Sequence, residues 1–159
     1  MNTSEYQTQL QYLWGKVGFI VHLSQMIEYT LSNILAFDEI LREYDVVDSM
    51  CYCEHNDLAK KANQWYEKLK SMTMGNIIGH ARRIKFFTEE SEQLLAQINS
   101  ERNFIIHNLF KEDLFLQHMD TNPAFYFPRL EALIDKMYNA NAQLNDIFKQ
   151  QKTEYRSMS

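Results

Sequence analysis

Glycine, proline and cysteine are scarce in this sequence. Its 159 residues include four glycines, two prolines and two cysteines. Tight turns depend on glycine and proline, so their scarcity argues against a turn-rich β-sandwich. The cysteines, Cys51 and Cys53, are separated by one residue, which is too close for an ordinary structural disulfide. A chain without a disulfide framework suits a reducing compartment, and we predict a cytoplasmic location.

Long hydrophobic runs are also lacking. The most apolar stretch, residues 17–35, is interrupted by polar residues: His22, Ser24, Gln25, Glu28, Ser32 and Asn33. This stretch is therefore too polar to span a bilayer. Residues 1–11 are polar and contain no basic segment followed by an apolar run, so no signal peptide is predicted. We expect no membrane partner.

Side chains of the kinds that bind metals occur together in the run Cys51-Tyr52-Cys53-Glu54-His55. A zinc site needs a second pair of ligands at a suitable spacing, and the sequence has no further cysteine. We therefore predict no metal site and no cofactor.

Apolar residues recur at steps of three and four, which is the period of a helix that buries one face. The longest such pattern consists of Leu10, Leu13, Trp14, Val17, Ile20, Val21, Ile27, Leu31, Ile34 and Leu35. Residues 39–44 can continue this helix. Residues 45–56 are predicted to form a connection.

Capping residues indicate where three further helices begin. Asp57 can cap a helix that ends near residue 71, and Thr73 can cap a short helix over residues 74–86. Thr88 precedes a helix whose first turn is acidic, as the helix dipole favours.

The last part of the chain is predicted to contain a short helical piece over residues 112–119 and a long helix that starts near Pro128. Residues 151–159 read as a polar, frayed tail. The fold class that follows is all-α, an antiparallel bundle of four to six helices. It forms a single domain over residues 1–159, with its core in residues 10–150.

Positive charge gathers in one part of an acidic chain. The net charge is −5, yet residues 60–85 contain a single acidic residue, Glu67, and a group of basic ones. The basic residues are Lys60, Lys61, Lys68, Lys70, Arg82, Arg83 and Lys85. A basic surface on an acidic body can steer a polyanion, so these residues are predicted to bind RNA. The alternative is an ordinary solvated helix face.

The segment Glu101-Arg102-Asn103-Phe104-Ile105-Ile106-His107-Asn108 lies late in the helix that follows Thr88. Arg102 falls on the apolar stripe formed by Leu94, Ile98, Ile105 and Leu109. A buried charge is costly unless it is paired, so Arg102 needs a partner. Glu28, on a second face of the first helix, is the predicted partner. The alternative for Glu28 is an exposed position on the surface.

The same segment contains side chains suited to cleaving RNA without a metal. Histidine transfers protons near neutral pH, and arginine offers a fixed fork to phosphate oxygens. Asn103 and His107 lie about 40° apart on a helix and share a face, whereas Arg102 and His107 lie about 140° apart. Two such helices that meet across a two-fold axis would pool their groups. Arg102, Asn103 and His107 are the candidate catalytic residues.

This order, arginine then asparagine and a histidine four residues further on, resembles the signature of the HEPN superfamily (the higher-eukaryote and prokaryote nucleotide-binding domain). The turn Ser71-Met72-Thr73-Met74-Gly75 and the run Asn108-Leu109-Phe110 extend the resemblance, which covers residues 10–148. It implies a bundle of four to five helices that dimerises through the motif helices. Many members are metal-independent endoribonucleases that serve as toxins or in phage defence, and others only bind nucleotides, RNA or protein.

The resemblance predicts a homodimeric ribonuclease that acts through Arg102, Asn103 and His107, supported by Glu28, and that leaves a 2′,3′-cyclic phosphate. An antitoxin or another regulatory protein would be a further partner. One alternative is a non-catalytic HEPN-like module that binds a nucleotide, RNA or a protein. In a third interpretation the bundle is purely structural, and Arg102 braces the core against Glu28.

Overall fold

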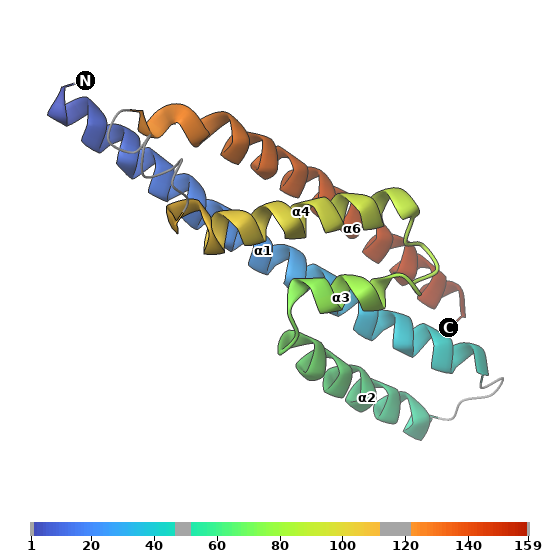
Figure 1. Ribbon diagram of the computed structural model, residues 1–159. Helices are drawn as coiled ribbons and strands as arrows, with labels where there is room; N and C mark the ends of the chain where they lie inside the picture. The colour runs from blue at the N-terminus through green and yellow to red at the C-terminus, as the bar shows by residue number, and fades with distance from the viewer. Residues whose placement is uncertain (1, 47–51, 112–121, 159) are drawn as a thin grey trace.

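The computed structural model describes residues 2–46, 52–111 and 122–158. These ranges contain α-helices and short 3-10 helices and no strand, which confirms the predicted all-α bundle (Figure 1). In chain order the elements are α1 (Thr3–Val46), α2 (Tyr52–Lys70), α3 (Met74–Ala81), α4 (Glu89–His107), η1 (Leu109–Lys111), η2 (Pro123–Tyr126) and α6 (Phe127–Met158).

The two longest helices, α1 and α6, run parallel and form the spine of the bundle (Figure 1). Tyr12 contacts Glu131 near their starts, and Ile34 contacts Gln151 near their ends, so the predicted antiparallel arrangement is wrong for this pair. α1 has 44 residues and is therefore about 66 Å long at 1.5 Å per residue. Its apolar stripe supplies much of the core, including Leu13, Ile20, Leu31 and Ile34, each with an exposed fraction of 0%. Residues 39–44 continue this helix as predicted, because residues 36–46 contain no glycine or proline that would end it.

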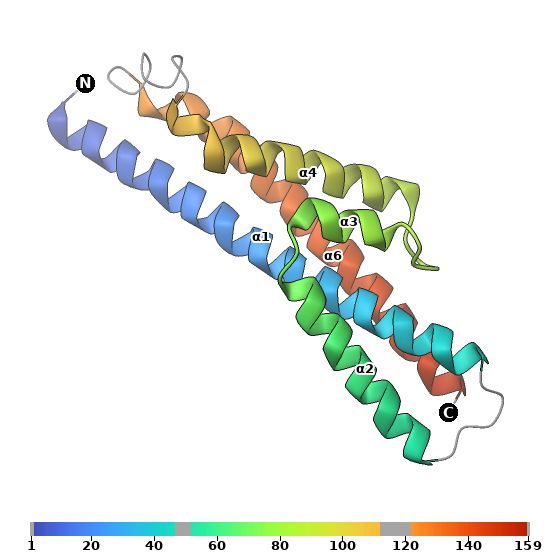
Figure 2. The same cartoon turned by 60° about the horizontal axis from the view of Figure 1, so that its bottom comes forward.

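α2 turns back along the C-terminal half of α1, and α3 and α4 then lie beside the middle and the N-terminal half of α1 (Figures 1 and 2). α2 begins at Tyr52 rather than at the predicted Asp57. No glycine or proline stands between these positions, so nothing in the chain prevents an earlier start. The predicted connection over residues 45–56 is therefore too long at both ends. α1 continues to Val46, and α2 begins at Tyr52.

The two predicted threonine caps are both confirmed. The Thr73 hydroxyl accepts a hydrogen bond from the backbone N–H of Asn76, and the Thr88 hydroxyl accepts one from that of Ser91. α3, however, ends at Ala81 and not near residue 86. The backbone N–H of Ile84 instead donates to the Ala81 carbonyl in a turn, and this turn buries the Ile84 side chain.

α6 starts one residue before the predicted Pro128 and continues to Met158, so the predicted frayed tail is wrong. Gln151 has an exposed fraction of 0%, and its side-chain amide donates to the backbone carbonyl of Ile34, 3.0 Å away. The Tyr155 ring packs edge-on against Phe37, with centroids 5.6 Å apart. The tail is polar in composition, but α1 supplies partners for it.

Two predictions fall outside the described residues. The helical piece over 112–119 lies in a range that the structure does not describe, and so does Cys51 of the run of metal-binding residue types.

Candidate functional site

An open groove lies between α4 and the turn that leads into α3. Its volume is about 360 Å³, and it is lined by Thr73, Met74, Gly75, Asn99, Arg102, Asn103, His107 and Asn108. The three predicted catalytic residues therefore line one groove within a single chain. Arg102 and His107 point about 140° apart around the helix axis. They still line the same groove, because the arginine side chain is long enough to reach across toward Asn103.

α4 divides its side chains between the core and the groove. Leu95, Ile98 and Ile105 are buried, each with an exposed fraction of 1% or less. Leu94, which the sequence pattern placed on the core stripe, is half-buried, and Leu95 takes its place. The core side of α4 holds the helix in place, so its polar side faces the groove.

The polar side of α4 is a ridge of side chains at four-residue steps: Asn99, Asn103 and His107. Asn99 and Asn103 are half-buried, and His107 is exposed. Asn99 was not among the predicted site residues. Its spacing of four residues before Asn103 is the signal in the sequence that would have found it.

Arg102 is held in place from two sides. Its Nη1 donates to the Asn103 Oδ1 at 3.0 Å, and its Nη2 lies 3.7 Å from the Glu28 Oε1. The Arg102 Nε is buried and has no hydrogen-bond partner among the described residues. The predicted ion pair with Glu28 is thereby confirmed, and it connects α1 to α4.

The Arg102–Glu28 pair is not sealed from solvent, since the two side chains are 22% and 27% exposed. Burial raises the pKa of the Glu28 carboxyl, and the nearby charge of Arg102 partly counteracts that rise. The carboxylate is thus poorly solvated and depends on Arg102 for compensation. An arginine held in this way presents its remaining N–H donors in a fixed direction.

The turn into α3 forms the opposite wall of the groove. A Cβ atom added to Gly75 would lie 3.3 Å from the Asn99 Nδ2, so a glycine at this position lets α3 approach α4 closely. At Gly79, the other glycine of α3, an added Cβ would meet no atom within 4 Å. Gly75 therefore sets the width of the groove, and Gly79 does not.

The predicted basic surface is largely neutralised by carboxylates. The pairs are Lys60–Asp57, Lys61–Glu43, Lys70–Glu67, Arg82–Glu92 and Lys85–Glu154, at nitrogen–oxygen distances of 2.5–3.9 Å. Lys68 lies over the Trp65 ring, and the Arg83 Nη2 is 3.0 Å from the His80 Nδ1. These residues do not line the groove at Arg102. Lys70 lines a smaller cavity next to it.

The described residues contain no group of three or more histidine, cysteine, aspartate or glutamate side chains that could hold a metal ion. Over the same ranges, none of the helices combines the length and the apolar character needed to cross a membrane. No family model, no curated protein and no solved structure matches this chain.

Proposed function

We propose that this chain is a metal-independent endoribonuclease of the HEPN type. The observation that carries the proposal is the groove in which an anchored arginine, an asparagine and an exposed histidine come together. An open groove above Arg102 also counts against the purely structural interpretation, in which the arginine would be sealed into the core. RNA in the cytoplasm is the proposed substrate.

In the proposed reaction, Arg102 binds the scissile phosphate and neutralises the negative charge that develops on its oxygens. The ribose 2′-hydroxyl loses its proton to a general base and attacks the phosphorus. The bond from phosphorus to the 5′-oxygen breaks, and that oxygen takes a proton from a general acid. The products are a 2′,3′-cyclic phosphate and a free 5′-hydroxyl, so atoms and charge balance without a metal or a cofactor.

This reaction needs two proton-transfer groups, and the groove offers one. Among the described residues that line it, His107 is the single side chain of a type that exchanges protons near neutral pH. We therefore propose a homodimer in which α4 meets α4 of a second copy and the two histidines serve as base and acid. The exposure of His107 at the edge of the groove supports this arrangement.

A toxin or phage-defence nuclease would account for a small chain with this chemistry, and an antitoxin that covers the groove would be its regulatory partner. The second candidate function is a non-catalytic module that binds a nucleotide, RNA or a protein. The neutralised basic residues and the net charge of −5 favour it, because a nuclease gains affinity for RNA from positive potential around its groove.

The test is RNA cleavage by the purified protein in excess EDTA. Arg102→Ala and His107→Ala should each lower the rate by at least about 100-fold, as expected for loss of charge stabilisation or of general acid–base catalysis. His22→Ala is the matched control, because His22 is exposed on α1 and lines a different cavity. Cleavage that persists in both site variants, or that requires a metal, refutes the assignment. Binding of RNA without cleavage selects the second candidate.

A further inference from the structure

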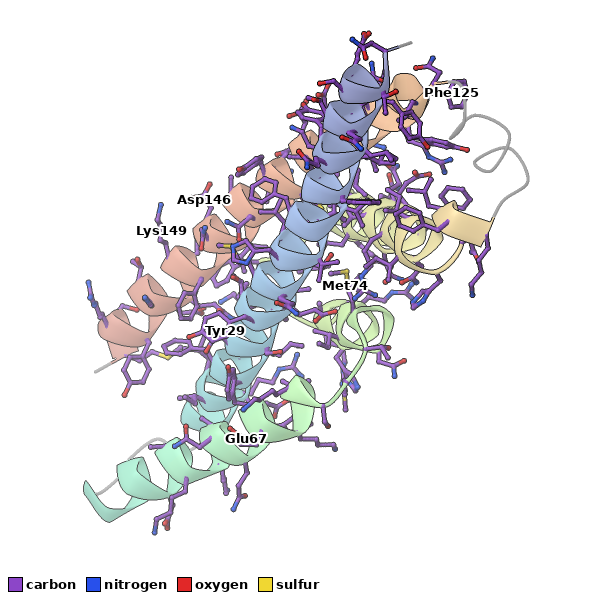
Figure 3. All side chains as sticks on the ribbon, turned by 90° about the vertical axis from the view of Figure 1, so that its left-hand side faces the viewer. Tyr29, Glu67, Met74, Phe125, Asp146 and Lys149 are labelled. Atoms are coloured by element: carbon purple, nitrogen blue, oxygen red, sulfur yellow. The ribbon has the colours of Figure 1, made fainter. Side chains whose placement is uncertain are left out.

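A second cavity lies where α1, the end of α2 and the start of α3 meet. Its volume is about 180 Å³, and the side chains that give it chemical character are Gln25, Glu28, Tyr29, Ser32, Tyr66 and Lys70. Figure 3 shows Tyr29 on α1 and Met74 at the start of α3, and the Tyr29 ring contacts Tyr66 of α2. The proposed cleavage reaction does not use this cavity.

The cavity adjoins the groove. Glu28 lines the cavity, Arg102 lines the groove, and their charged groups are 3.7 Å apart. Met72 lines the cavity, and the next residue, Thr73, lines the groove. The ion pair and the turn over residues 72–73 therefore form the boundary between the two spaces. A ligand with an anion at Arg102 can therefore reach the cavity with its next group across this boundary.

The walls of the cavity suit a flat, hydrogen-bonding ring. The rings of Tyr29 and Tyr66 have centroids 6.1 Å apart and are nearly perpendicular, at 86°. One ring can therefore stack on a planar ligand while the other closes the edge of the cavity. The volume is below the roughly 300–1,000 Å³ of sites for drug-sized ligands, which suits a single nucleobase and not a longer segment of RNA.

We propose that this cavity holds the base of the nucleotide whose phosphate binds to Arg102, with the base stacked on Tyr29 or Tyr66. The inference rests on the proposed function, which supplies single-stranded RNA as the ligand. An extruded base that stacks on aromatic side chains is the common way in which proteins recognise single-stranded RNA. Lys70 also lines the cavity, but its ammonium lies 3.7 Å from the Glu67 carboxylate, so the proposed base site does not depend on it.

Glu28 gives the cavity a preference among bases. An ionised carboxylate only accepts hydrogen bonds, so it favours a base that presents an exocyclic amino group. Cytosine has such a group where uracil has a carbonyl oxygen, and the two bases have nearly the same shape. The cavity should therefore bind cytosine more tightly than uracil.

The experiment is isothermal titration of the protein with 3′-CMP, 3′-UMP and inorganic phosphate. The wild type should bind 3′-CMP more tightly than 3′-UMP, and both more tightly than phosphate. Replacing the tyrosine that stacks on the base, by Tyr29→Leu or Tyr66→Leu, should weaken 3′-CMP binding by roughly 5- to 150-fold, the effect of losing a base stack. The other variant should have a smaller effect, and both should leave phosphate binding unchanged. Arg102→Ala should weaken the binding of both 3′-CMP and inorganic phosphate.

Tyr138→Leu is the matched control, because Tyr138 is 52% exposed on α6, comparable with the 60% of Tyr29, and does not line the cavity. Thermal unfolding of each variant separates a folding defect from a binding defect, and Tyr29 is exposed enough to be replaced safely. If 3′-CMP binds no more tightly than phosphate, or if both tyrosine variants bind it like the wild type, the base site is refuted.

The two proposals can fail separately. Tyrosine-dependent binding of 3′-CMP by a protein that cuts no RNA in EDTA keeps the base site and refutes the nuclease. Cleavage that depends on His107, together with equal affinities for 3′-CMP and phosphate, refutes the base site alone.

Discussion

Replacing Glu28 by glutamine tests whether its ion pair with Arg102 serves stability or positioning. Two unit charges 3.7 Å apart attract each other by about 4.5 kcal/mol at an effective dielectric constant of ~20, and by about 1 kcal/mol in water. If the pair were a sealed structural brace, removing one partner would cost about 3–5 kcal/mol. Because both side chains are mostly buried, the cost of removing the Glu28 carboxylate from water offsets most of this attraction, and a net value of about 0–1 kcal/mol is expected.

The raised pKa of Glu28 also indicates that the ion pair adds little net stability at neutral pH. Its main cause is burial, which outweighs the opposing attraction of Arg102, so the folded protein binds this proton more tightly than the unfolded chain does. The contribution of Glu28 to the free energy of unfolding is therefore most favourable at low pH. It falls as the pH rises from the unfolded pKa through the raised folded pKa. Glutamine does not titrate, so Glu28→Gln lacks this pH dependence.

We expect the free energy of unfolding of Glu28→Gln to lie within about 1 kcal/mol of the wild type at pH 7, because glutamine has the same shape and, being neutral, is less costly to bury. The difference in the free energy of unfolding, variant minus wild type, should be more positive at pH 7 than at pH 4.5. Urea unfolding followed by circular dichroism at both pH values measures these differences. RNA cleavage should nevertheless fall, since Arg102 loses its charged anchor.

A loss of more than about 3 kcal/mol at pH 7 would refute this reasoning and favour a structural brace. If the difference in the free energy of unfolding between the variant and the wild type does not change with pH, burial does not raise the pKa of Glu28 as argued. Arg129→Ala is a useful comparison. Arg129 on α6 forms an ion pair with Glu101, the residue before Arg102 on α4, and this pair is more exposed, with side chains at 41% and 35%.

The remaining predictions concern the groove wall and the start of α4. Gly75→Ala should narrow the groove at Asn99 and slow RNA cleavage without loss of stability, because alanine favours a helix over glycine by up to about 1 kcal/mol. Gly79→Ala is its control and should raise stability while leaving cleavage unchanged; equal rates for the two variants would contradict the role of Gly75. Thr88→Ala removes the cap of α4 and should lower the free energy of unfolding by about 0.5–2 kcal/mol, measured by urea unfolding. Thr8→Ala, which removes an exposed hydroxyl in the second turn of α1 that caps no helix, should cost less than Thr88→Ala.

Features set by neighbouring residues could be predicted from the sequence. Thr73 and Thr88 cap the helices that directly follow them, and the apolar period of α1 lies within one continuous segment. The Arg102–Glu28 pair was also predictable, although its partners are far apart in the chain. An arginine on a core stripe demands an acidic partner, and Glu28 lies next to the core face of the longest predicted helix.

Features that depend on how helices pair could not be predicted in the same way. The end of α6 depends on the Ile34 carbonyl that binds Gln151, and the basic residues are neutralised by distant carboxylates such as Glu92 and Glu154. The cavity at Tyr29 and Tyr66 exists because α2 turns back along α1. No periodicity within one helix indicates any of these contacts.

The parallel pairing of α1 with α6 has a consequence for synthesis of the protein on the ribosome. α1 carries Glu28 and is translated early, α4 carries Arg102 and His107, and α6 follows both in the chain. Until α6 emerges, the apolar stripe of α1 lacks its longest partner, and contacts as distant as Gln151 to Ile34 cannot form. The groove between α3 and α4 would therefore be held in its final geometry only after α6, on which α4 packs, has left the exit tunnel. Under the proposed function, a chain that is still attached to its ribosome would therefore not cut the RNA around it.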